Sequence, residues 1–443
     1  MRHDEIQLEN RRRRSLLIPA LLGIAVLANV VGAQAQEPSS VEGVLDSICS
    51  SPPEEFVAFC AFFSGLEDSD RDEVVEQITP RENVTQGNLL INLPQTGYRE
   101  VGRRLAALRT GVRAVAGRTV SWSPDRREVR IASTLPALFA AQEPTTGPGP
   151  GIDEPFEEAP RWGLFASGRH ATVDKDGTLI EEGYYTRNVG GTVGLDRRFG
   201  DDAVLGAAVA YQSVDLDLSG DGGGIDADGF NVTAFASRTS DAGYLQGVLG
   251  YGTLDFDLTR HVDLPVPFLG ETRYTVQGGA DGDQLMADLM GGWEHVFGAS
   301  TVELFGRASL VDANVDGDAE GGEVPFALAI GDQSIRSLLS ELGIDWSRAV
   351  SVAWGVVQPQ LRAGWIHEFD DDERQIPGQF VGDPLDREFG VPTDEPDRDY
   401  FNLAVGLTLT GYRGWSFFAT YDTDLERSTL DNYVINLGLR KEM

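Results

Sequence analysis

Basic residues are scarce in this sequence. Its 443 residues include 36 Lys and Arg against 70 Asp and Glu, so the formal charge at pH 7 is −34. A chain of this charge repels the phosphate backbone, and we expect no binding to nucleic acid by charge. Acidic stretches such as Asp370 to Glu373 and Asp394 to Asp399 are expected to lie in solvated loops.

Histidine is missing between Glu37 and Pro160. This excludes a Ser-His-Asp or Cys-His nucleophile from that region. The later histidines fall on different expected strands and loops: His170, His261, His295 and His367. Paired acids such as Asp201 and Asp202 lie in expected turns, where solvated carboxylates are commoner than acid/base pairs. We therefore predict no catalytic residue, no cofactor and no enzyme activity.

Long apolar runs are missing after the first 31 residues. The run from Leu16 to Val31 is shorter than the roughly 20 residues that a spanning helix needs. It follows Arg11 to Arg14 and precedes the small-x-small site Ala33-Gln34-Ala35, which predicts a signal peptide over residues 1–35 in place of a membrane anchor. The mean hydropathy of −0.20 and the lack of a later apolar run exclude a helical membrane protein.

Cysteine occurs twice, as Cys49 and Cys60, and both residues follow the signal. An even count in an exported chain predicts one disulfide, which would contribute about 3 kcal/mol in the chain-entropy model. Two buried free thiols are the alternative. Because no histidine lies nearby, the pair is a poor zinc site, and we predict no metal.

Alternation of apolar with polar or small residues runs from Arg161 to Arg440. In Phe401 to Thr410 every second residue is a large apolar one, starting with Phe401. Successive side chains of a strand point to opposite faces, so one face of this strand is wholly apolar. The pattern recurs at Val302 to Leu310, Leu338 to Trp346, Trp415 to Tyr421 and Tyr433 to Leu439.

The links between these strands alternate between short and long. The short ones are Gly200 to Asp202, Ser240 to Ala242, Gly298 to Ser300, Arg348 to Val350 and Gly411 to Gly414. The long ones are Ala171 to Gly183, Asp215 to Gly229, Asp257 to Gly279, Asp312 to Ser334, Asp370 to Asp399 and Asp424 to Asp431. A barrel with periplasmic turns and extracellular loops requires this alternation, whereas a soluble sandwich does not. Residues 161–443 are therefore predicted to form an all-β transmembrane barrel of about twelve antiparallel strands.

Aromatic residues beside the short turns are predicted to form a girdle at the membrane interface. They are Trp162, Phe199, Tyr244, Phe297, Trp346, Tyr412 and Trp415.

Five stretches of the barrel region also resemble the β-domain of bacterial autotransporters, the type V secretion proteins. They are residues 163–168 (GLFASG), 199–202 (FGDD), 360–365 (QLRAGW), 397–401 (DRDYF) and 434–440 (VINLGLR). The resemblance covers Trp162 to Leu439 and rests on their order and spacing. It implies an outer-membrane translocator. Domains of this family normally end in an aromatic residue, whereas this sequence ends Lys441-Glu442-Met443.

Residues 36–141 are predicted to form a small, mostly helical region, a passenger or a plug. Helices are expected at Val41 to Ile48, Glu54 to Leu66 and Asp68 to Ile78, and a hairpin within Thr119 to Ile131. The basic stretch Tyr98 to Ala116 has two interpretations. It is an ordinary amphipathic helix, or a pore plug whose arginines dock on Glu303, Glu341 and Asp345. The family resemblance implies a helix in the pore. Residues 142–160 form a Pro/Gly/acidic linker.

One stretch has the spacing of a calcium loop, namely Asp312, Asn314, Asp316, Gly317 and Glu323. Helices should flank such a loop, and strands are expected here. We therefore favour a solvated hairpin tip over a calcium site.

Together these features predict an outer-membrane translocator that anchors or exports its short N-terminal region. The alternative is a channel or structural barrel whose N-terminal region stays in the periplasm or plugs the lumen. Expected partners are outer-membrane lipid and lipopolysaccharide, the barrel assembly machinery and periplasmic chaperones. The expected barrel is monomeric and lies in the outer membrane of a Gram-negative bacterium.

Overall fold

The structure is a computed structural model. It describes residues 39–81, 85–87, 89–90, 118–123, 128–133, 162–200, 202–240, 243–322, 324–411 and 414–443. The predicted signal peptide (residues 1–35), the arginine-rich stretch Tyr98 to Ala116 and the linker (residues 142–160) lie outside the described residues. None of the described helices is both long and apolar enough to cross a membrane.

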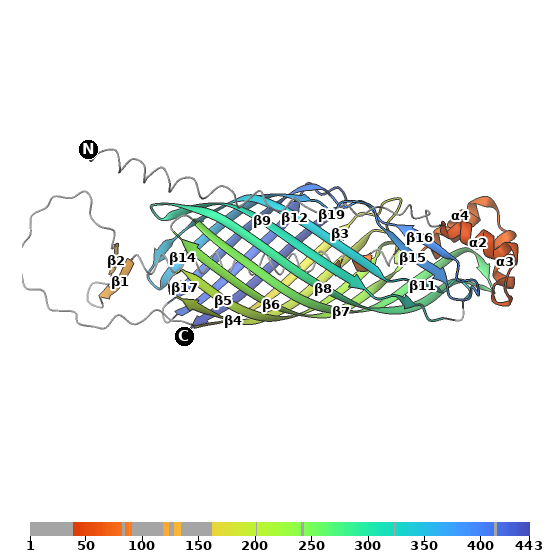
Figure 1. Ribbon diagram of the computed structural model, residues 1–443, viewed down its shortest axis with the longest axis horizontal. Helices are drawn as coiled ribbons and strands as arrows, with labels where there is room; N and C mark the ends of the chain where they lie inside the picture. The colour runs from red at the N-terminus through yellow and green to blue at the C-terminus, as the bar shows by residue number, and fades with distance from the viewer. Residues whose placement is uncertain are drawn as a thin grey trace, which may run out of the picture. The chain divides into compact units, whose positions relative to one another are not determined.

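Twelve of the described strands form a closed antiparallel ring, which confirms the predicted barrel (Figure 1). In chain order they are β3 (Trp162–Lys175), β4 (Tyr184–Phe199), β5 (Ala203–Leu218), β6 (Gly223–Ser240), β7 (Gly243–Phe268), β8 (Glu271–Phe297), β9 (Ser300–Val315), β12 (Gln333–Arg348), β14 (Gly355–Glu368), β17 (Asp399–Gly411), β18 (Trp415–Leu425) and β19 (Leu430–Glu442). Each strand pairs with the next, and β19 pairs with β3 to close the ring.

The closing seam extends over the whole of β19. Its register runs from Leu430 opposite Lys175 to Glu442 opposite Gly163. Lys441 and Glu442 therefore continue the strand. An open edge in hydrocarbon would leave unpaired amides and carbonyls, so this pairing is a condition of membrane insertion.

The two faces of each strand differ as predicted. In β17, Val405 is 47% exposed on the outer face, whereas Ala404 beside it is 4% exposed and faces the lumen. Large apolar side chains are exposed around the ring: Leu164, Val189, Val193, Leu195, Leu205, Val209, Phe230, Val232, Leu245, Leu249, Leu285, Leu289, Leu304, Leu342, Ile344, Leu361, Leu403, Leu407, Leu437 and Leu439. This outer surface, the membrane belt, is the surface that faces lipid in a barrel of this class.

Four of the seven side chains predicted for the girdle beside the short turns point outward, away from the lumen. Trp162, Phe199, Phe297 and Trp415 are exposed on the outer face. Tyr244 is the exception, because it is buried in the lumen and its hydroxyl donates to Glu303. Trp346 is half-buried, and Tyr412 lies outside the described residues.

The prediction of long loops at Asp215 to Gly229 and Asp257 to Gly279 is wrong. Both stretches continue the hairpins β5–β6 and β7–β8. β7 and β8 have 26 and 27 residues, against the roughly 9 to 11 that cross a membrane. The β7–β8 hairpin ends in a turn at Leu269 and Gly270, both with positive φ (53° and 92°), so the chain reverses within two residues.

The apolar face of these hairpins changes sides above the membrane belt. In β7 the outward residues Leu249 and Tyr251 are followed by outward Asp255 and Asp257, while Phe256 is buried inside. The change occurs at Tyr211 in β5 and at Phe230 in β6 as well. We call the parts beyond these aromatics the outer hairpins. An apolar outer face suits lipid, and a polar one suits water, so the exchange marks the end of the hydrocarbon.

Two further strand pairs occupy the links Asp312 to Ser334 and Asp370 to Asp399, which were predicted as loops. β10 (Asp318–Ala319), β11 (Leu328–Ile330), β15 (Gln375–Phe380) and β16 (Glu388–Pro392) form a four-stranded sheet. We call it the outer sheet. A short strand, β13 (Val350–Val352), pairs with β14 at the opposite end of the barrel. Separately, β1 (Arg118–Ser123) pairs with β2 (Glu128–Ser133), as the sequence predicts.

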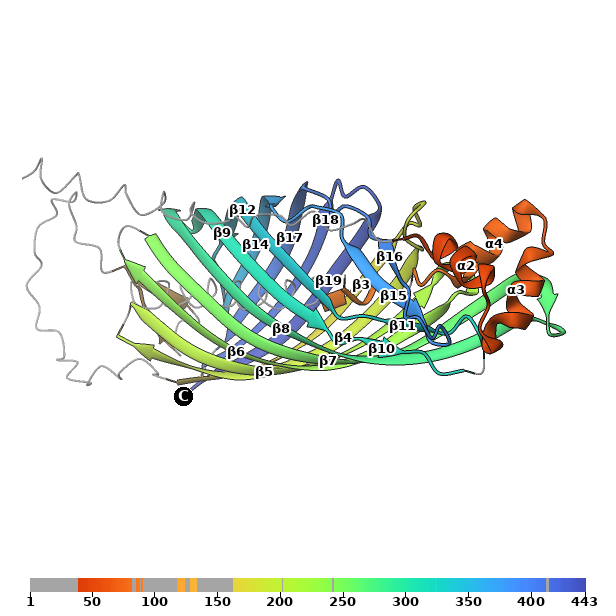
Figure 2. The ribbon, with the colours of Figure 1, turned by 45° about the vertical axis from the view of Figure 1, so that its right-hand side comes forward.

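The N-terminal helices form where the sequence predicts them. They are α2 (Val41–Ser50), the 3₁₀ turn η1 (Glu54–Phe56), α3 (Val57–Ser64) and α4 (Asp68–Ile78). The side chain of Ser40 caps α2 by accepting a hydrogen bond from the Gly43 amide at 3.1 Å. We call α2 to α4 the cap. It lies beside the outer sheet and the far ends of β7 and β8 (Figure 2).

Carboxylates face each other across the outer hairpins. Asp226 lies opposite both Asp215 and Asp257, and Asp255 lies opposite Asp228 and Asp281. Like charges directly opposite each other weaken a strand pair. Burial, followed by repulsion from the neighbouring aspartates, raises the pKa of Asp226, which lies outside the membrane-spanning segment.

We expect Asp226→Asn to protect the amides of the β5–β6 outer hairpin at neutral pH. A raised pKa in the folded state means that repulsion is absent when the carboxyl is protonated and returns as the pH rises through that pKa. Acidification should therefore protect the original hairpin and leave the variant less affected. Hydrogen exchange of the hairpin amides at pH 7 and pH 4 measures both effects. Asp312→Asn is the control, because Leu285 and Arg336 lie opposite it. Equal protection by both substitutions would contradict the repulsion.

We also expect Val405→Arg to destabilise the barrel by about 2 to 4 kcal/mol, because it places a charge in the membrane belt near mid-bilayer. Thr408→Arg on the lumen face of β17 should be tolerated better. The urea concentration at which the heat-modifiable gel band is lost measures both. Equal losses would contradict the assignment of the two faces.

Candidate translocation pore

The lumen at the level of the membrane belt is lined by polar and charged side chains. They project from neighbouring strands and are buried from solvent: Gln246, Gln284, Asp288, Glu303, Arg307, Ser309, Glu341, Arg362, Asn402 and Asn436. The strict alternation of each strand puts them on the face opposite the lipid.

An ion network across β8, β9, β12 and β14 holds one side of this lumen. Arg307 contacts Asp288 at 2.5 Å and Glu341 at 3.3 Å, and Arg362 contacts Glu341 at 3.2 Å. The guanidinium of Arg362 also lies 3.8 Å from the ring centre of Phe305. Glu341, which was predicted to receive arginines of a plug helix, is thus bound by arginines of the barrel.

A second network joins the seam at the end that carries the short turns. Arg440 contacts Asp196 at 3.0 Å, and Arg198 contacts Glu442 at 2.9 Å. These pairs pass over Gly163, where a Cβ would lie 2.4 Å from Arg440 Nη2. Glycine at this place lets charges on β4 and β19 meet across β3.

Inward aromatic side chains lie flat over glycines of the adjoining strand. Phe165 covers Gly194, Phe235 covers Gly206, and Phe305 covers Gly343. At each glycine a Cβ would be within 2.3 Å of the ring. The missing side chain lets the ring rest on the barrel wall.

Above the membrane belt the inner wall of the barrel is apolar. Buried residues of β5, β6, β7, β9 and β12 form it: Val214, Leu216, Leu218, Ile225, Ala227, Leu254, Phe256, Leu258, Val311, Ala313, Val315 and Ile335. We call this inward-facing surface the outer wall, because it lies beyond the membrane belt, on the side of the outer hairpins. Leu89 and Leu90 pack against it and are 5% and 0% exposed.

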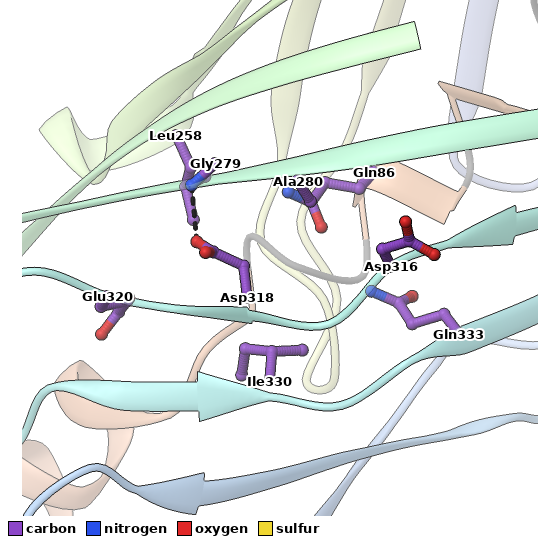
Figure 3. A pocket seen from close by; sticks show the side chains of 9 residues that line it. All are labelled: Gln86, Leu258, Gly279, Ala280, Asp316, Asp318, Glu320, Ile330 and Gln333. Atoms are coloured by element: carbon purple, nitrogen blue, oxygen red, sulfur yellow. Dashed lines mark hydrogen bonds between the residues drawn. The ribbon is translucent and has the colours of Figure 1, made fainter. Parts of the chain in front are cut away.

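A small cavity marks the place where this part of the N-terminal region meets the barrel. Its volume is about 10 Å³, and Gln86 lines it together with Leu258, Ala280 and Gln333 (Figure 3). Beside it the Gly279 amide donates to Asp318 at 2.6 Å. Residues 85–87 and 89–90 are helical, and all five are buried. The described chain therefore fills part of the barrel above the membrane belt.

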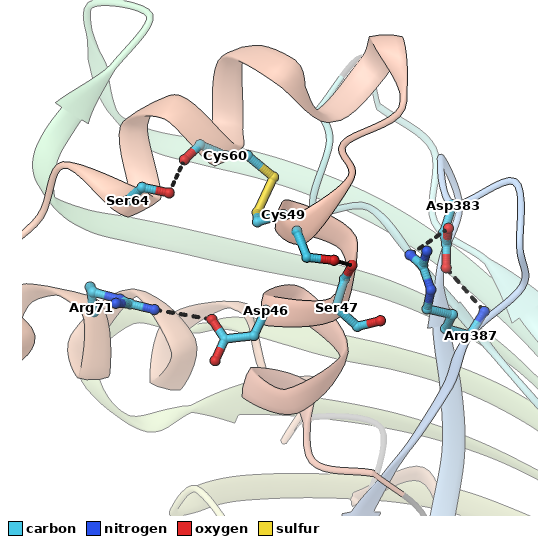
Figure 4. Close-up of a disulfide and its surroundings, with 9 residues drawn as sticks. Asp46, Ser47, Cys49, Cys60, Ser64, Arg71, Asp383 and Arg387 are labelled. Atoms are coloured by element: carbon cyan, nitrogen blue, oxygen red, sulfur yellow. Dashed lines mark hydrogen bonds and ion pairs between the residues drawn. A yellow bond between two sulfur atoms is a disulfide. The ribbon is translucent and has the colours of Figure 1, made fainter.

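The cap is closed by a disulfide between Cys49 on α2 and Cys60 on α3, with an S–S distance of 2.01 Å and a Cα–Cα distance of 5.2 Å (Figure 4). Arg71 on α4 donates to Asp46 on α2 at 3.1 Å. These contacts hold the three helices together.

The cap and the barrel share one hydrophobic core. From the cap come Val41, Val44, Leu45, Ile48, Phe56, Phe59, Cys60, Phe63, Val74 and Ile78. From the outer hairpins, the outer sheet and the segment before it come Val262, Leu264, Phe268, Phe326, Leu328, Ile330, Ile376, Phe380, Phe389 and Val391. Phe59 is central, since its ring lies 5.6 Å from that of Phe268 and 5.9 Å from that of Phe326.

The remaining links meet at a cavity of about 100 Å³ beside the mouth of the barrel. Lys175 contacts Glu181 and Asp394, each at 2.9 Å. Arg427 contacts Asp397 at 3.4 Å and lies 4.6 Å from the ring centre of Tyr400. These ion pairs join three links to one another. The charged side chains around this cavity are therefore paired with each other.

The model of the autotransporter β-domain family matches residues 164–422, more than half of the chain. The chain belongs to the autotransporter β-domain family. The barrel is therefore an outer-membrane translocator domain, as the sequence predicts.

Three solved structures are similar to this translocator. The translocator domain of the autotransporter NalP from Neisseria meningitidis has a TM-score of 0.52 at 14% identity, over 64% of this chain and 89% of that one. The β-domain of the Bordetella autotransporter BrkA scores 0.46 at 18% identity (64% and 100%), and the transport unit of AIDA-I from Escherichia coli scores 0.42 at 12% (66% and 93%). The first score supports a common fold. Comparison with curated proteins finds no match.

The histidines of the translocator are dispersed over the barrel. His367 contacts Asp399 at 2.9 Å on the exposed side of β14, and His295 stacks on Trp293. His261 contacts the carbonyl of Asp221, and His170 lies near Tyr433. Each therefore has a local structural neighbour, and the described residues bring no two of the four together.

The calcium-like stretch does not form a loop. Asp312 and Asn314 belong to β9 and point outward, Asp316 and Gly317 follow the end of this strand, and Glu323 lies outside the described residues. Extended backbone cannot wrap its ligands around an ion as a calcium loop does. Within the described part of the chain no group of three or more His, Cys, Asp or Glu is placed to hold a metal.

The sequence patterns did not lead us to predict the outer wall or the shared core. Apolar residues at every second position continue through Leu254, Phe256 and Leu258, but they are offset by one position from Leu249 and Tyr251. That change of phase is the signal that the inner face becomes apolar. Residues 85–90 carry no comparable signal.

We expect Glu341→Gln to destabilise the translocator by about 3 to 5 kcal/mol, because it leaves buried Arg307 and Arg362 without their shared carboxylate. Asp217→Asn removes a carboxylate from an exposed pair with Arg187 and should cost less than about 1 kcal/mol. Urea titration of the heat-modifiable band compares the two variants. Similar midpoints would show that the lumen network adds no more than a surface pair.

Proposed function

We propose that this translocator carries its own N-terminal region across the outer membrane and keeps it at the cell surface as the folded cap. The observation that supports this best is the core shared between the cap and the barrel. Ten buried residues of the cap meet ten from the barrel side, and neither set has another apolar surface in the described structure to cover it.

Burial of apolar surface is the main favourable contribution to folding, and a cap of about 40 residues is too small to bury enough by itself. The cap therefore needs the outer sheet and the outer hairpins as a folding partner. Two hydrogen bonds also fix the position of the cap on the barrel. The Asp263 amide donates to Gln77 at 3.2 Å, and the Gly390 amide donates to the Ser39 carbonyl at 3.0 Å.

The orientation follows from the two ends of the barrel. In outer-membrane barrels the short turns face the periplasm and the longer extensions face the outside. The cap packs on the β7–β8 hairpin and on the outer sheet, which belong to the outer end by this rule. The same chain starts β3 at the turn end, so the cap and Trp162 lie at opposite ends of the barrel.

The rival function is a channel or structural barrel whose N-terminal region stays in the periplasm. In that case the apolar residues of the outer sheet would face water, and Phe59 would lose its contacts with Phe268 and Phe326. The shared core favours display over this rival. A display role without catalysis is also in keeping with the absence of histidine between Glu37 and Pro160.

The remaining parts of the proposal follow from position and chemistry. Residues 1–35 direct export and are removed, and residues 142–160 link the exported region to β3. The membrane belt contacts lipid, and the outer hairpins adjoin lipopolysaccharide. Periplasmic chaperones and the barrel assembly machinery would deliver the chain, because its strands cannot insert unpaired. One closed ring without an unpaired edge in the described strands is consistent with a monomer.

Cysteine labelling on intact cells tests the proposal. With the native disulfide oxidised, Asp72→Cys on the exposed side of α4 should react with a membrane-impermeant maleimide. Leu269→Cys, at the 77% exposed tip of the β7–β8 hairpin, is the positive control, and Ser240→Cys in a periplasmic turn is the negative control. Asp72→Cys should match Leu269→Cys. Labelling of Asp72→Cys that requires permeabilised cells, as for Ser240→Cys, would refute surface display.

A further inference from the structure

The segment that follows the cap is buried where the lumen changes character. Thr85 and Gln86 are each 2% exposed, and Leu90 is fully buried. Below it the lumen is lined by charges such as Glu303 and Arg307, and around it lies the apolar outer wall. We call residues 85–87, 89 and 90 the stop segment.

The stop segment fits the outer wall closely at Gly87. A Cβ at this position would lie 2.5 Å from Ile335 Cδ1 and 3.3 Å from Arg374 Nη1. The guanidinium of Arg374 is largely buried beside the segment, and this burial lowers its pKa. No larger residue fits at position 87 unless Ile335 moves.

A second close contact lies one turn further along the chain. Leu90 Cδ1 lies 3.2 Å from the place where a Cβ on Gly282 would be, and Phe256 Cε2 lies 3.0 Å from the same point. Leu90 thus occupies a recess made by the bare backbone of β8 and the ring of a β7 residue. Leu89 joins the same cluster.

We propose that the stop segment ends the outward movement of the N-terminal region and fixes how far the chain is exported. This inference rests on the proposed export of the cap. It adds that the end point is set inside the barrel, at Gly87 and Leu90, and does not depend on the cap alone.

The physical basis is that movement in either direction is unfavourable. Retreat by a few residues would place Leu89 and Leu90 among the buried charges of the lumen, where apolar side chains gain nothing and polar groups lose solvent. Advance would expose both leucines to water and empty the recess beside Gly282. Below the outer wall the same apolar cluster continues through Val248, Met286 and Phe235, which stand between the polar side chains of the lumen, so the outer wall is the larger apolar surface on the described path to the cap.

The cap and the stop segment hold the N-terminal region in place in two different ways. The shared core holds the cap on the outer sheet, but a chain between the cap and the barrel could still slide. A fixed contact at Gly87 removes that freedom. The shared core and the contact at Gly87 can therefore be tested separately.

Cross-linking tests where the chain stops. Gln86 and Ala280 line the same small cavity, so Gln86→Cys with Ala280→Cys should be joined by a short bifunctional thiol reagent on intact cells. Adding Gly87→Val should cut the cross-linked fraction roughly tenfold, because overpacking against Ile335 displaces the segment. Adding Ile335→Ala to these three substitutions should restore the cross-link, because it removes the atoms that the introduced valine side chain would strike.

Two controls accompany this series. Gly168→Val lies on the lipid face of β3, where the nearest atom to a Cβ is 3.9 Å away, and it should leave the cross-link unchanged. The heat-modifiable band confirms a folded barrel in every variant. An undiminished cross-link with Gly87→Val, or a failure of Ile335→Ala to restore it in a folded barrel, would overturn the stop segment.

Surface labelling of Asp72→Cys separates this inference from the proposed function. Labelling retained with Gly87→Val while the cross-link is lost supports both export and an independent stop. Labelling retained with the cross-link intact refutes the stop segment and leaves display standing. An unlabelled Asp72→Cys in the otherwise unchanged protein refutes display, and the stop segment with it.

Discussion

The pairing of backbone groups in hydrocarbon is the constraint on which this structure depends. With no water to satisfy an open edge, β19 has to pair with β3 along its full length. An antiparallel ring of twelve strands then places the start of β3 and the end of β19 at the same end of the barrel. That end carries the short turns, and the extended hairpins and the links rise from the other. The closure of the ring therefore determines which end of the barrel carries the short turns and which end carries the extended hairpins and the links.

The second determinant is where the hydrocarbon stops. At Tyr211, Phe230 and Tyr251 the apolar face of the strands changes from outside to inside, although the hydrogen-bonded ladder continues without interruption. The same strands therefore serve as a membrane wall below and as half of a water-soluble domain above. The apolar outer wall that results can hold apolar chain, which the charged lumen below cannot. Acidic residues on the outer surface keep this domain solvated at the cost of some repulsion between neighbouring strands.

The third feature is the dependence of the cap on the barrel. A disulfide and one ion pair hold α2, α3 and α4 together, but the apolar faces of the helices are covered by the outer sheet and the outer hairpins. A region this small gains stability mainly by burying its apolar side chains against those of the barrel. Under the proposed export of the cap, this arrangement connects transport to folding, because the free energy of forming the shared core is released only on the side where the outer sheet lies.

The sequence by itself determined the barrel, because a period of two with one apolar face is a local property of each strand, and Phe401 to Thr410 shows it without reference to any neighbour. It also determined the helices from Val41 to Ile78, through their capping and apolar spacing. It did not determine the outer sheet, the inward position of Tyr244 or the burial of Gly87 and Leu90. Each of these depends on residues far apart in the chain, such as Gly87 with Ile335, or Phe59 with Phe326. Only the tertiary structure decided which apolar surfaces meet, because the hydrophobic effect favours burial without specifying a partner, and the closed ring brings the partners together.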